Sequence, residues 1–333
     1  MSLRDRRAIT RFDIVAKRKR GSVAVASPAD FELRHAGESS GAGLSDEGTV
    51  YCADFSARRL FFVICDRRQE VLTSPFLYLA QFEQATQIVS VPFERLQEVV
   101  PDVVGQPVIV FSIGRCGSTL LAKLLNAVGT PTVSEPDVFT QIADRKRVPI
   151  SLVGSGIGRT LIRACAASFN SSVGPRFAVK LRSQCNGIAS LIAQSLPEAE
   201  FIFMMRERIS WARSRFRAFG GEPEALARMF RWGIESFHNL SISGNRPKLV
   251  WYQDVVENPL QAVRDLGFEA GGPDSFELVE TAMRQDSQQG SRLQRELLPA
   301  REMSTDQFQA FEREWQAVRP GDLISRYSLE RIG

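Results

Sequence analysis

Apolar and polar residues from Pro107 onward alternate between two kinds of segment. Continuous apolar runs predict buried strands, and they occupy residues 108–112, 177–181, 201–205 and 248–252. Between these runs, apolar residues recur every three or four positions, which predicts helices at 118–128, 187–196, 209–219, 224–237 and 259–266. Such alternation is typical of a parallel sheet with helices on both faces. We therefore predict an α/β fold with a central parallel sheet for residues 107–333.

Residues 1–106 follow a different pattern. Short β-like runs at 9–16, 22–26 and 60–65 are separated by turns rich in Gly and Ser. We predict a small N-terminal β-rich subdomain that packs on the main one. Within it, the Gly- and Ser-rich stretch 37–48 predicts a mobile loop.

Composition and charge narrow the classes of protein. The hydrophobic fraction of 44% and the charged fraction of 24% are ordinary for a globular chain, so a disordered or fibrous protein is excluded. The net charge of +4 is too small to indicate nucleic acid, but it would suit an anionic ligand. Basic residues gather near the N-terminus, which we interpret as a solvated tail, and again between Arg206 and Arg217.

Cysteine spacing and the lack of long apolar runs bear on the compartment. The five cysteines are widely spread without C-x-x-C spacing, which favours a reducing compartment. No apolar run approaches the roughly 20 residues of a membrane helix, and the charged N-terminus does not resemble a secretory signal. We predict a cytoplasmic protein without a membrane partner. The oligomeric state is not given by the sequence, and a homodimer stays open.

A candidate phosphate-binding loop connects the first strand of the parallel sheet to the next helix. It comprises Gly114, Arg115, Cys116, Gly117, Ser118 and Thr119. Glycines let successive N–H groups converge on one point, and the helix N-terminus adds positive charge there. Nucleoside triphosphatases place Lys before the hydroxyl residue and bind Mg²⁺ nearby. Here the cation comes earlier, which suits a phosphosulfate better than a metal-chelated triphosphate. The alternative is a simple connecting turn.

A second candidate anion-binding element follows another buried strand. Arg206 ends the strand 201–205, and Ser214 lies eight residues further on, within the next helix. A cation and a hydroxyl together can hold a phosphate by charge-assisted hydrogen bonds. The alternative for Arg206 is a salt bridge with Glu207 or Glu235. For four neighbouring arginines we favour a solvated helix face, namely Arg208, Arg213, Arg215 and Arg217.

These two elements resemble the sulfotransferases that use 3′-phosphoadenosine-5′-phosphosulfate (PAPS). That family carries Lys or Arg, Ser, Gly, Ser or Thr, and Thr after its first strand, and an Arg followed eight residues later by Ser. Cys116 replaces the usual Ser, and Leu120 replaces the adenine-stacking Trp of cytosolic members. The resemblance covers about 107–271. It implies that the 5′-phosphosulfate is bound by the loop that contains Arg115, Gly117, Ser118 and Thr119. It also implies that Arg206 and Ser214 bind the 3′-phosphate. A weaker resemblance places Arg292 in a loop over the nucleotide.

The resemblance also implies catalytic residues. Arg115 and Lys180 would stabilise the moving sulfuryl group. Cytosolic members read Lys-Thr-His in the strand of Lys180 and use the His as base, but this chain has Arg182 there. Glu135 lies where carboxylate-using members, such as the tyrosylprotein and heparan types, carry their Glu, so the resemblance makes it the base. An ion pair with Lys180 or Arg182 is the alternative role, and Asp137 is the second candidate base.

The predicted function is transfer of a sulfuryl group from PAPS to a hydroxyl or amine of an acceptor, which we expect to be a small molecule. The product would be adenosine 3′,5′-bisphosphate, and no metal is required. Two alternatives stay open. A P-loop kinase would need Mg²⁺, for which Asp254 is the conceivable ligand, and a nucleotide-binding scaffold would have the fold without activity.

Overall fold

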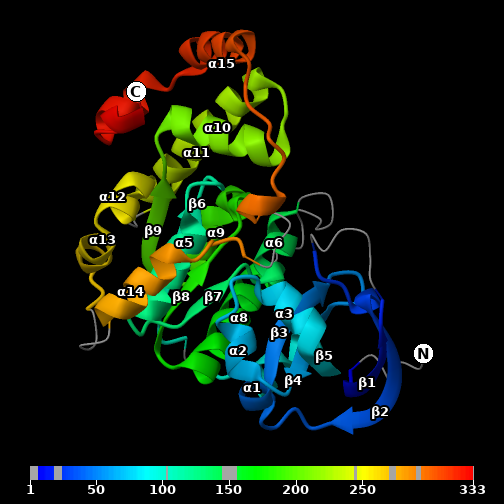
Figure 1. Cartoon of the computed structure of the whole chain (residues 1–333). Coiled ribbons are helices and arrows are strands. Elements are labelled where there is room, and N and C mark those ends of the chain that lie inside the picture. The colour runs from blue at the N-terminus through cyan, green and yellow to red at the C-terminus, as the bar shows by residue number, and fades with distance from the viewer. Residues whose placement is uncertain are drawn as a thin grey trace. The chain divides into compact units, whose positions relative to one another are not determined.

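The chain forms two five-stranded sheets with helices packed on them (Figure 1). The structure, a computed structural model, describes residues 7–18, 25–102, 104–144, 156–243, 246–269, 275–289 and 294–332. One sheet is parallel, and the other, built from the N-terminal residues, is antiparallel. The predicted α/β class with an additional β-rich segment is therefore confirmed.

The parallel sheet has the strand order β10-β9-β6-β8-β7. Its strands are β6 (Gln106–Ser112), β7 (Thr132–Ser134), β8 (Arg176–Lys180), β9 (Glu200–Met205) and β10 (Lys248–Trp251). Four of these strands coincide with apolar runs in the sequence, because strands covered on both faces carry apolar residues without alternation. Strand β7 has only three residues and is too short to be recognised from its pattern.

The antiparallel sheet has the strand order β2-β1-β5-β4-β3. Its strands are β1 (Ile9–Lys17), β2 (Phe31–Ser39), β3 (Gly48–Asp54), β4 (Arg59–Cys65) and β5 (Ala85–Pro92). The predicted loop over 37–48 is wrong in part, because residues 37–39 end β2 and Leu44–Glu47 form the short helix α1. Pairing with β1 draws the end of β2 into the sheet despite its loop-like composition, and Gly37, with φ of 136°, lies at an irregularity in that pairing. The mobility of this stretch stays a prediction.

The chain divides into two compact units, and the first comprises residues 1–109 and 131–200. Besides α1, its helices are α2 (Arg68–Leu72), α3 (Leu77–Gln84), α4 (Leu96–Val99), α6 (Asp137–Ala143), α8 (Ile157–Val173) and α9 (Ala189–Ser195), with 3₁₀ turns at Pro28–Asp30, Phe93–Arg95 and Ser183–Ile188. Gln141 of α6 accepts a hydrogen bond from the Ala53 N–H at 2.8 Å and donates one to the Ala26 carbonyl at 3.1 Å. The N-terminal strands thus share a core with α6. The boundary at residue 106 stays a prediction.

The second unit comprises residues 110–130 and 201–333. Its helices are α5 (Ser118–Ala127), α10 (Arg208–Phe219), α11 (Pro223–Ile242), α12 (Tyr252–Glu257), α13 (Pro259–Asp265), α14 (Ser275–Arg284), α15 (Thr305–Val318) and α16 (Gly321–Arg326), with 3₁₀ turns at Arg295–Leu297 and Glu330–Ile332. A chain of buried aromatic rings joins three of these helices: Trp211 lies 5.2 Å from Phe230, which lies 5.6 Å from Trp315. These contacts fix α10, the helix that follows Arg206.

The described residues contain neither a helix that could span a membrane nor a candidate metal site. None of the helices in these ranges combines the length and apolar character needed to cross a membrane. Likewise, these ranges contain no cluster of three or more His, Cys, Asp or Glu side chains placed to hold a metal ion.

Candidate active-site elements

The loop between β6 and α5 adopts the backbone that a phosphate cradle needs. Gly114, Arg115 and Gly117 have positive φ values of 70°, 57° and 89°. For Arg115 this is a sparsely populated conformation that costs free energy, and such strain persists where the surrounding structure enforces it. Trp211 enforces it here, because its indole N–H donates a hydrogen bond of 2.8 Å to the Gly114 carbonyl. The aromatic core of the second unit thereby holds the loop.

Gly117 is the N-cap residue of α5 and lies against the ring of Tyr252. A Cβ atom at this position would lie 2.3 Å from Cδ2 of Tyr252, well inside contact distance. Only glycine therefore fits both the left-handed backbone and the ring. Ser118 and Thr119 follow in the first helical turn, whose N–H groups have no partner within the helix and are available to an anion.

Replacing Gly117 with alanine should destabilise the protein by about 3 kcal/mol, because it adds backbone strain to a steric clash. Gly129 is the matched control, because its φ is 84° and an added Cβ would meet no atom within 4 Å. Gly129→Ala should cost only about 1 kcal/mol. Thermal and urea unfolding of both variants measure the difference.

Arg206 lies against the same loop. Its Nη1 is 3.5 Å from the Arg115 carbonyl oxygen, its Nε donates to Ser210 Oγ at 2.8 Å, and its guanidinium stacks 4.2 Å from the centre of the Tyr252 ring. Strands β6 and β9 are neighbours in the sheet, so the residues that follow their carboxyl ends meet at one edge. The structure thus brings Arg206 and the glycine loop together within the second unit.

Positive charge is concentrated at this place. Burial lowers the pKa of Arg115, and the nearby charge of Arg206 lowers it further. Burial also lowers the pKa of Arg215, with a contribution from Arg115. Cations that disfavour one another's charge are stabilised by a bound anion, and such groups are typical of functional sites. The interpretation as a solvated helix face is therefore wrong for Arg215, whose side chain is partly buried. It is also wrong for Arg208, which is buried and pairs with Glu312.

The remaining predicted nucleotide residues are placed as follows. Ser214 lies one turn beyond Ser210 on α10, and the hydroxyl that contacts Arg206 is that of Ser210. The Cys116 side chain is fully buried. The Thr119 hydroxyl accepts a hydrogen bond of 3.0 Å from Gln288. Arg292 lies outside the described residues.

Glu135 and Lys180 form an ion pair within the first unit. Lys180 Nζ contacts Glu135 Oε1, and Arg182 Nε donates to Glu135 Oε2 at 3.0 Å. Glu135 has a φ of 59°, and its N–H donates to the Lys180 carbonyl at 2.7 Å, which fixes the two residues to each other. Burial would raise the pKa of Glu135, but Lys180 and Arg182 outweigh it and hold that pKa below its ordinary value. The carboxylate is thus held in its ionised form.

Asp137, the second candidate base, is fully buried beside the same arginine. Its Oδ1 is 2.9 Å from Arg182 Nη1, and its Oδ2 accepts the Ala26 N–H. Arg182 also stacks 4.3 Å from the centre of the Tyr78 ring. Burial raises the pKa of Asp137 to about 7, although Arg182 opposes the shift.

Asp137 should therefore make stability depend on pH. Its pKa in the folded protein, about 7, lies above the ordinary value of 3.8, so folding favours the protonated form. This contribution is complete below about pH 4 and is lost as the pH rises to about 7, with a slope of up to about 1.4 kcal/mol per pH unit. Urea unfolding between pH 4 and 8 should show this slope in the native protein. It should be absent in Asp137→Asn, and equal slopes in both would contradict the assignment.

Comparisons with known proteins were made for the whole chain. No family model matches it, and no curated protein matches it. Among solved structures, it is similar to the sulfotransferase domain from the Synechococcus PCC 7002 olefin synthase, with 14% sequence identity and a TM-score of 0.36. The similarity covers 63% of this chain and 94% of that domain. At this level it carries no weight for function, which has to follow from the residues.

Several residues at the glycine loop were not predicted as site residues. Tyr252 has no predicted role in the site, although its place after β10, the strand beside β9, could have indicated one. Ser210 lies four residues after Arg206, a spacing at which helical side chains meet. Gln288 gives no signal in the sequence, because its contact with Thr119 joins residues far apart in the chain.

Proposed function

We propose that this protein is a sulfotransferase that takes the sulfuryl group from PAPS and transfers it to a hydroxyl or amine of a small acceptor. The observation that carries the proposal is the contact of Arg206 with the glycine loop, 3.5 Å from Nη1 to the Arg115 carbonyl. It supports one site with two cationic elements, as a nucleotide phosphorylated at two positions requires. In this proposal, the loop from Arg115 to Thr119 binds the 5′-phosphosulfate.

The 3′-phosphate would be bound by Arg206, with the hydroxyl of Ser210 or Ser214 on α10. A guanidinium held by stacking on Tyr252 loses little conformational entropy on binding, because its geometry is already fixed. Charge-assisted hydrogen bonds from such a group discriminate against nucleotides without a 3′-phosphate. Selectivity for PAPS over ATP would follow from this.

PAPS supplies the activated sulfuryl group, and the protein would supply charge and a base. Arg115 and Lys180 would stabilise the negative charge that develops during transfer. Glu135 is the proposed base, because the adjacent cations keep it ionised and able to accept a proton. Its ion pair would also hold the Lys180 ammonium in place. No step of this scheme needs a metal ion.

Two observations favour a sulfotransferase over a kinase. The residue before Ser118 is Gly117, where triphosphatases carry Lys. Asp254, the conceivable Mg²⁺ ligand, lies within α12 and pairs with Arg331 at 2.5 Å. An inactive scaffold makes the same binding predictions as the enzyme and differs from it only in turnover.

Thermal shift with three nucleotides tests the proposal. Adenosine 3′,5′-bisphosphate without metal should raise the Tm more than AMP does, and more than ATP with Mg²⁺. A shift that needs Mg²⁺ would favour the kinase, and equal shifts with AMP and the bisphosphate would exclude a 3′-phosphate site. Formation of the bisphosphate from PAPS in the presence of an acceptor then separates the enzyme from the scaffold.

A further inference from the structure

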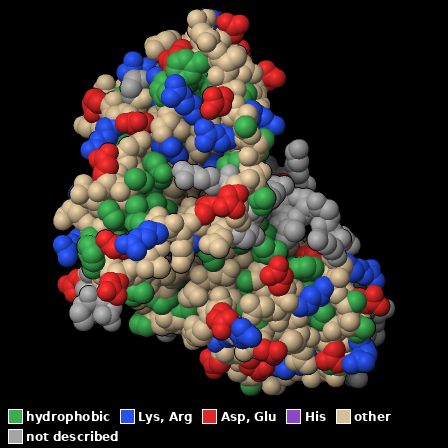
Figure 2. Space-filling model, in the orientation of Figure 1, with side chains coloured by type: hydrophobic (Ala, Val, Ile, Leu, Met, Phe, Trp, Pro, Cys, Tyr) green, Lys and Arg blue, Asp and Glu red, His purple; other side chains and the backbone are tan. Residues whose placement is uncertain are grey.

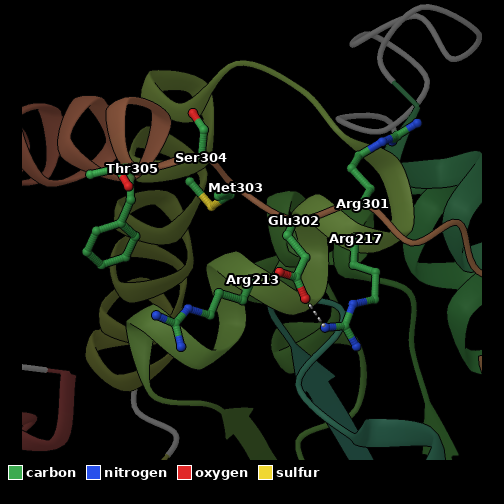
Figure 3. A pocket seen from close by; sticks show the side chains of 8 residues that line it. Arg213, Arg217, Arg301, Glu302, Met303, Ser304 and Thr305 are labelled. Carbon is green, nitrogen blue, oxygen red and sulfur yellow. Dashed lines mark ion pairs between the residues drawn. The ribbon is translucent and has the colours of Figure 1, made fainter.

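Three arginine side chains line a cavity of about 460 Å³ in the second unit (Figure 3). Arg213 and Arg217 belong to α10, and Arg301 belongs to the segment that leads into α15. The other lining residues are Glu302, Met303, Ser304, Thr305 and Phe308. In Figure 2, Lys and Arg side chains over α10 and α15 are interspersed with Asp and Glu side chains.

The positive charge of this cavity is poorly balanced. Glu302 is the one carboxylate among its lining residues, and its oxygen lies 3.8 Å from Arg217 Nη2. The two side chains are 84% and 51% exposed, so the pair contributes little to stability. Arg213 and Arg217 are also four residues apart on one helix, where like charges repel. The charged side chains of this cavity therefore contribute little to the free energy of folding.

Two of these arginines make further contacts. The Arg213 guanidinium lies 5.8 Å from the centre of the Phe308 ring. Arg301 approaches the end of α10 at Gly220, where an added Cβ would lie 2.6 Å from its Nη1. Guanidinium groups match the oxygens of a phosphate or carboxylate in charge and geometry. Met303 and Phe308 add an apolar wall, and Thr305 adds a hydroxyl.

We propose that this cavity is a second anion-binding site, which takes a small molecule with a dianionic group on an apolar body, as in an aryl phosphate. The dianion contacts Arg217 in place of Glu302, and the charges of Arg213 and Arg301 raise the positive potential of the cavity around it. The apolar body packs on Phe308 and Met303. This site is independent of sulfuryl transfer, because it uses residues that the donor site does not.

Calorimetric titration of the full chain with phenyl phosphate tests the site. The titration is made with saturating adenosine 3′,5′-bisphosphate, so that the glycine loop does not compete for the probe. Arg217→Ala should weaken binding roughly tenfold, the effect of losing one charge-assisted hydrogen bond. Glu302→Gln should strengthen it severalfold, because a competing carboxylate is removed. A gain of affinity cannot arise from misfolding.

Arg228→Ala is the matched control. It also removes one exposed arginine from the same unit, but Arg228 lies on α11 and pairs with Glu314 at 2.6 Å, outside the cavity. Its affinity for phenyl phosphate should change less than twofold. The proposal is overturned if phenyl phosphate does not bind at millimolar concentration, or if Arg217→Ala and Arg228→Ala weaken binding equally. Unchanged affinity in Glu302→Gln would overturn the assigned position of the anion.

Discussion

Replacing Arg206 with alanine is expected to weaken the binding of adenosine 3′,5′-bisphosphate roughly 100-fold, because charge-assisted hydrogen bonds to a phosphate are lost. The side chain is partly buried between the Tyr252 ring and the Arg115 carbonyl, and burial lowers its pKa. A cation in this environment interacts with an anion more strongly than a fully solvated one does. Isothermal titration of the variant and the native protein measures the loss.

AMP provides the control, because it has no 3′-phosphate. Its affinity should change by less than about threefold, since a lost contact to an absent group costs nothing. Arg206→Lys should recover part of the bisphosphate affinity, because it keeps the charge but not the planar fork. If AMP and the bisphosphate lose affinity equally, Arg206 supports the loop through Tyr252 instead of binding the second phosphate.

The parallel half of the fold was predictable because its signals are local. Strands such as β6 and β9 contain continuous apolar runs, and α5 begins at Ser118, the residue that its periodicity indicates. The meeting of Arg206 with the glycine loop could also be predicted, since parallel strands present their carboxyl ends at the same edge. The local pattern and the shared edge of parallel strands together therefore predict the glycine loop and the arginine beside it.

The other parts of the fold and of the candidate site depend on contacts between residues far apart in the chain, which the sequence pattern does not encode. Strand β2 (Phe31–Ser39) is mostly polar and exposed, and it becomes a strand because β1 pairs with it. Helix α8 has a buried face made largely of Ala, Ser and Cys, which gives a weak apolar signal. At the site, Ser210 contacts Arg206 although the family resemblance pointed to Ser214. Pairing and helix packing decide such details, and both join residues distant in sequence.

Replacing Glu135 with glutamine is expected to destabilise the protein by about 3–5 kcal/mol, because buried Lys180 loses the carboxylate it pairs with and Arg182 keeps Asp137 as its acidic partner. Lys180 and Arg182 are only 4% and 12% exposed, so water does not replace the carboxylate. The Tm should fall by on the order of 10 °C. The double variant Glu135→Gln with Lys180→Met should recover part of this loss, since it removes one unpaired charge. An unchanged Tm in the single variant would contradict the buried ion pair.

Turnover separates the proposed catalytic role of Glu135 from its role in stability. The variant should retain affinity for adenosine 3′,5′-bisphosphate, because the glycine loop and Arg206 do not include Glu135, but it should lose transfer activity. Because Lys180 is itself a proposed catalytic residue, activity is measured in the single variant at a temperature well below its own Tm, where loss of folding cannot explain the result. Wild-type transfer activity in Glu135→Gln would remove this residue from the mechanism and leave its ion pair as a structural feature.

The pH dependence of transfer then decides between the two carboxylates. A base must be deprotonated, so the rate falls as the pH drops below the pKa of that base. The pKa of Glu135 lies below its ordinary value, which predicts a flat rate from pH 8 down to about pH 5. If Asp137 is the base, its pKa of about 7 predicts a tenfold fall per pH unit below neutrality. The measurement uses an alcohol acceptor, whose own proton does not titrate in this range, and an acid limb near pH 7 would transfer the role to Asp137.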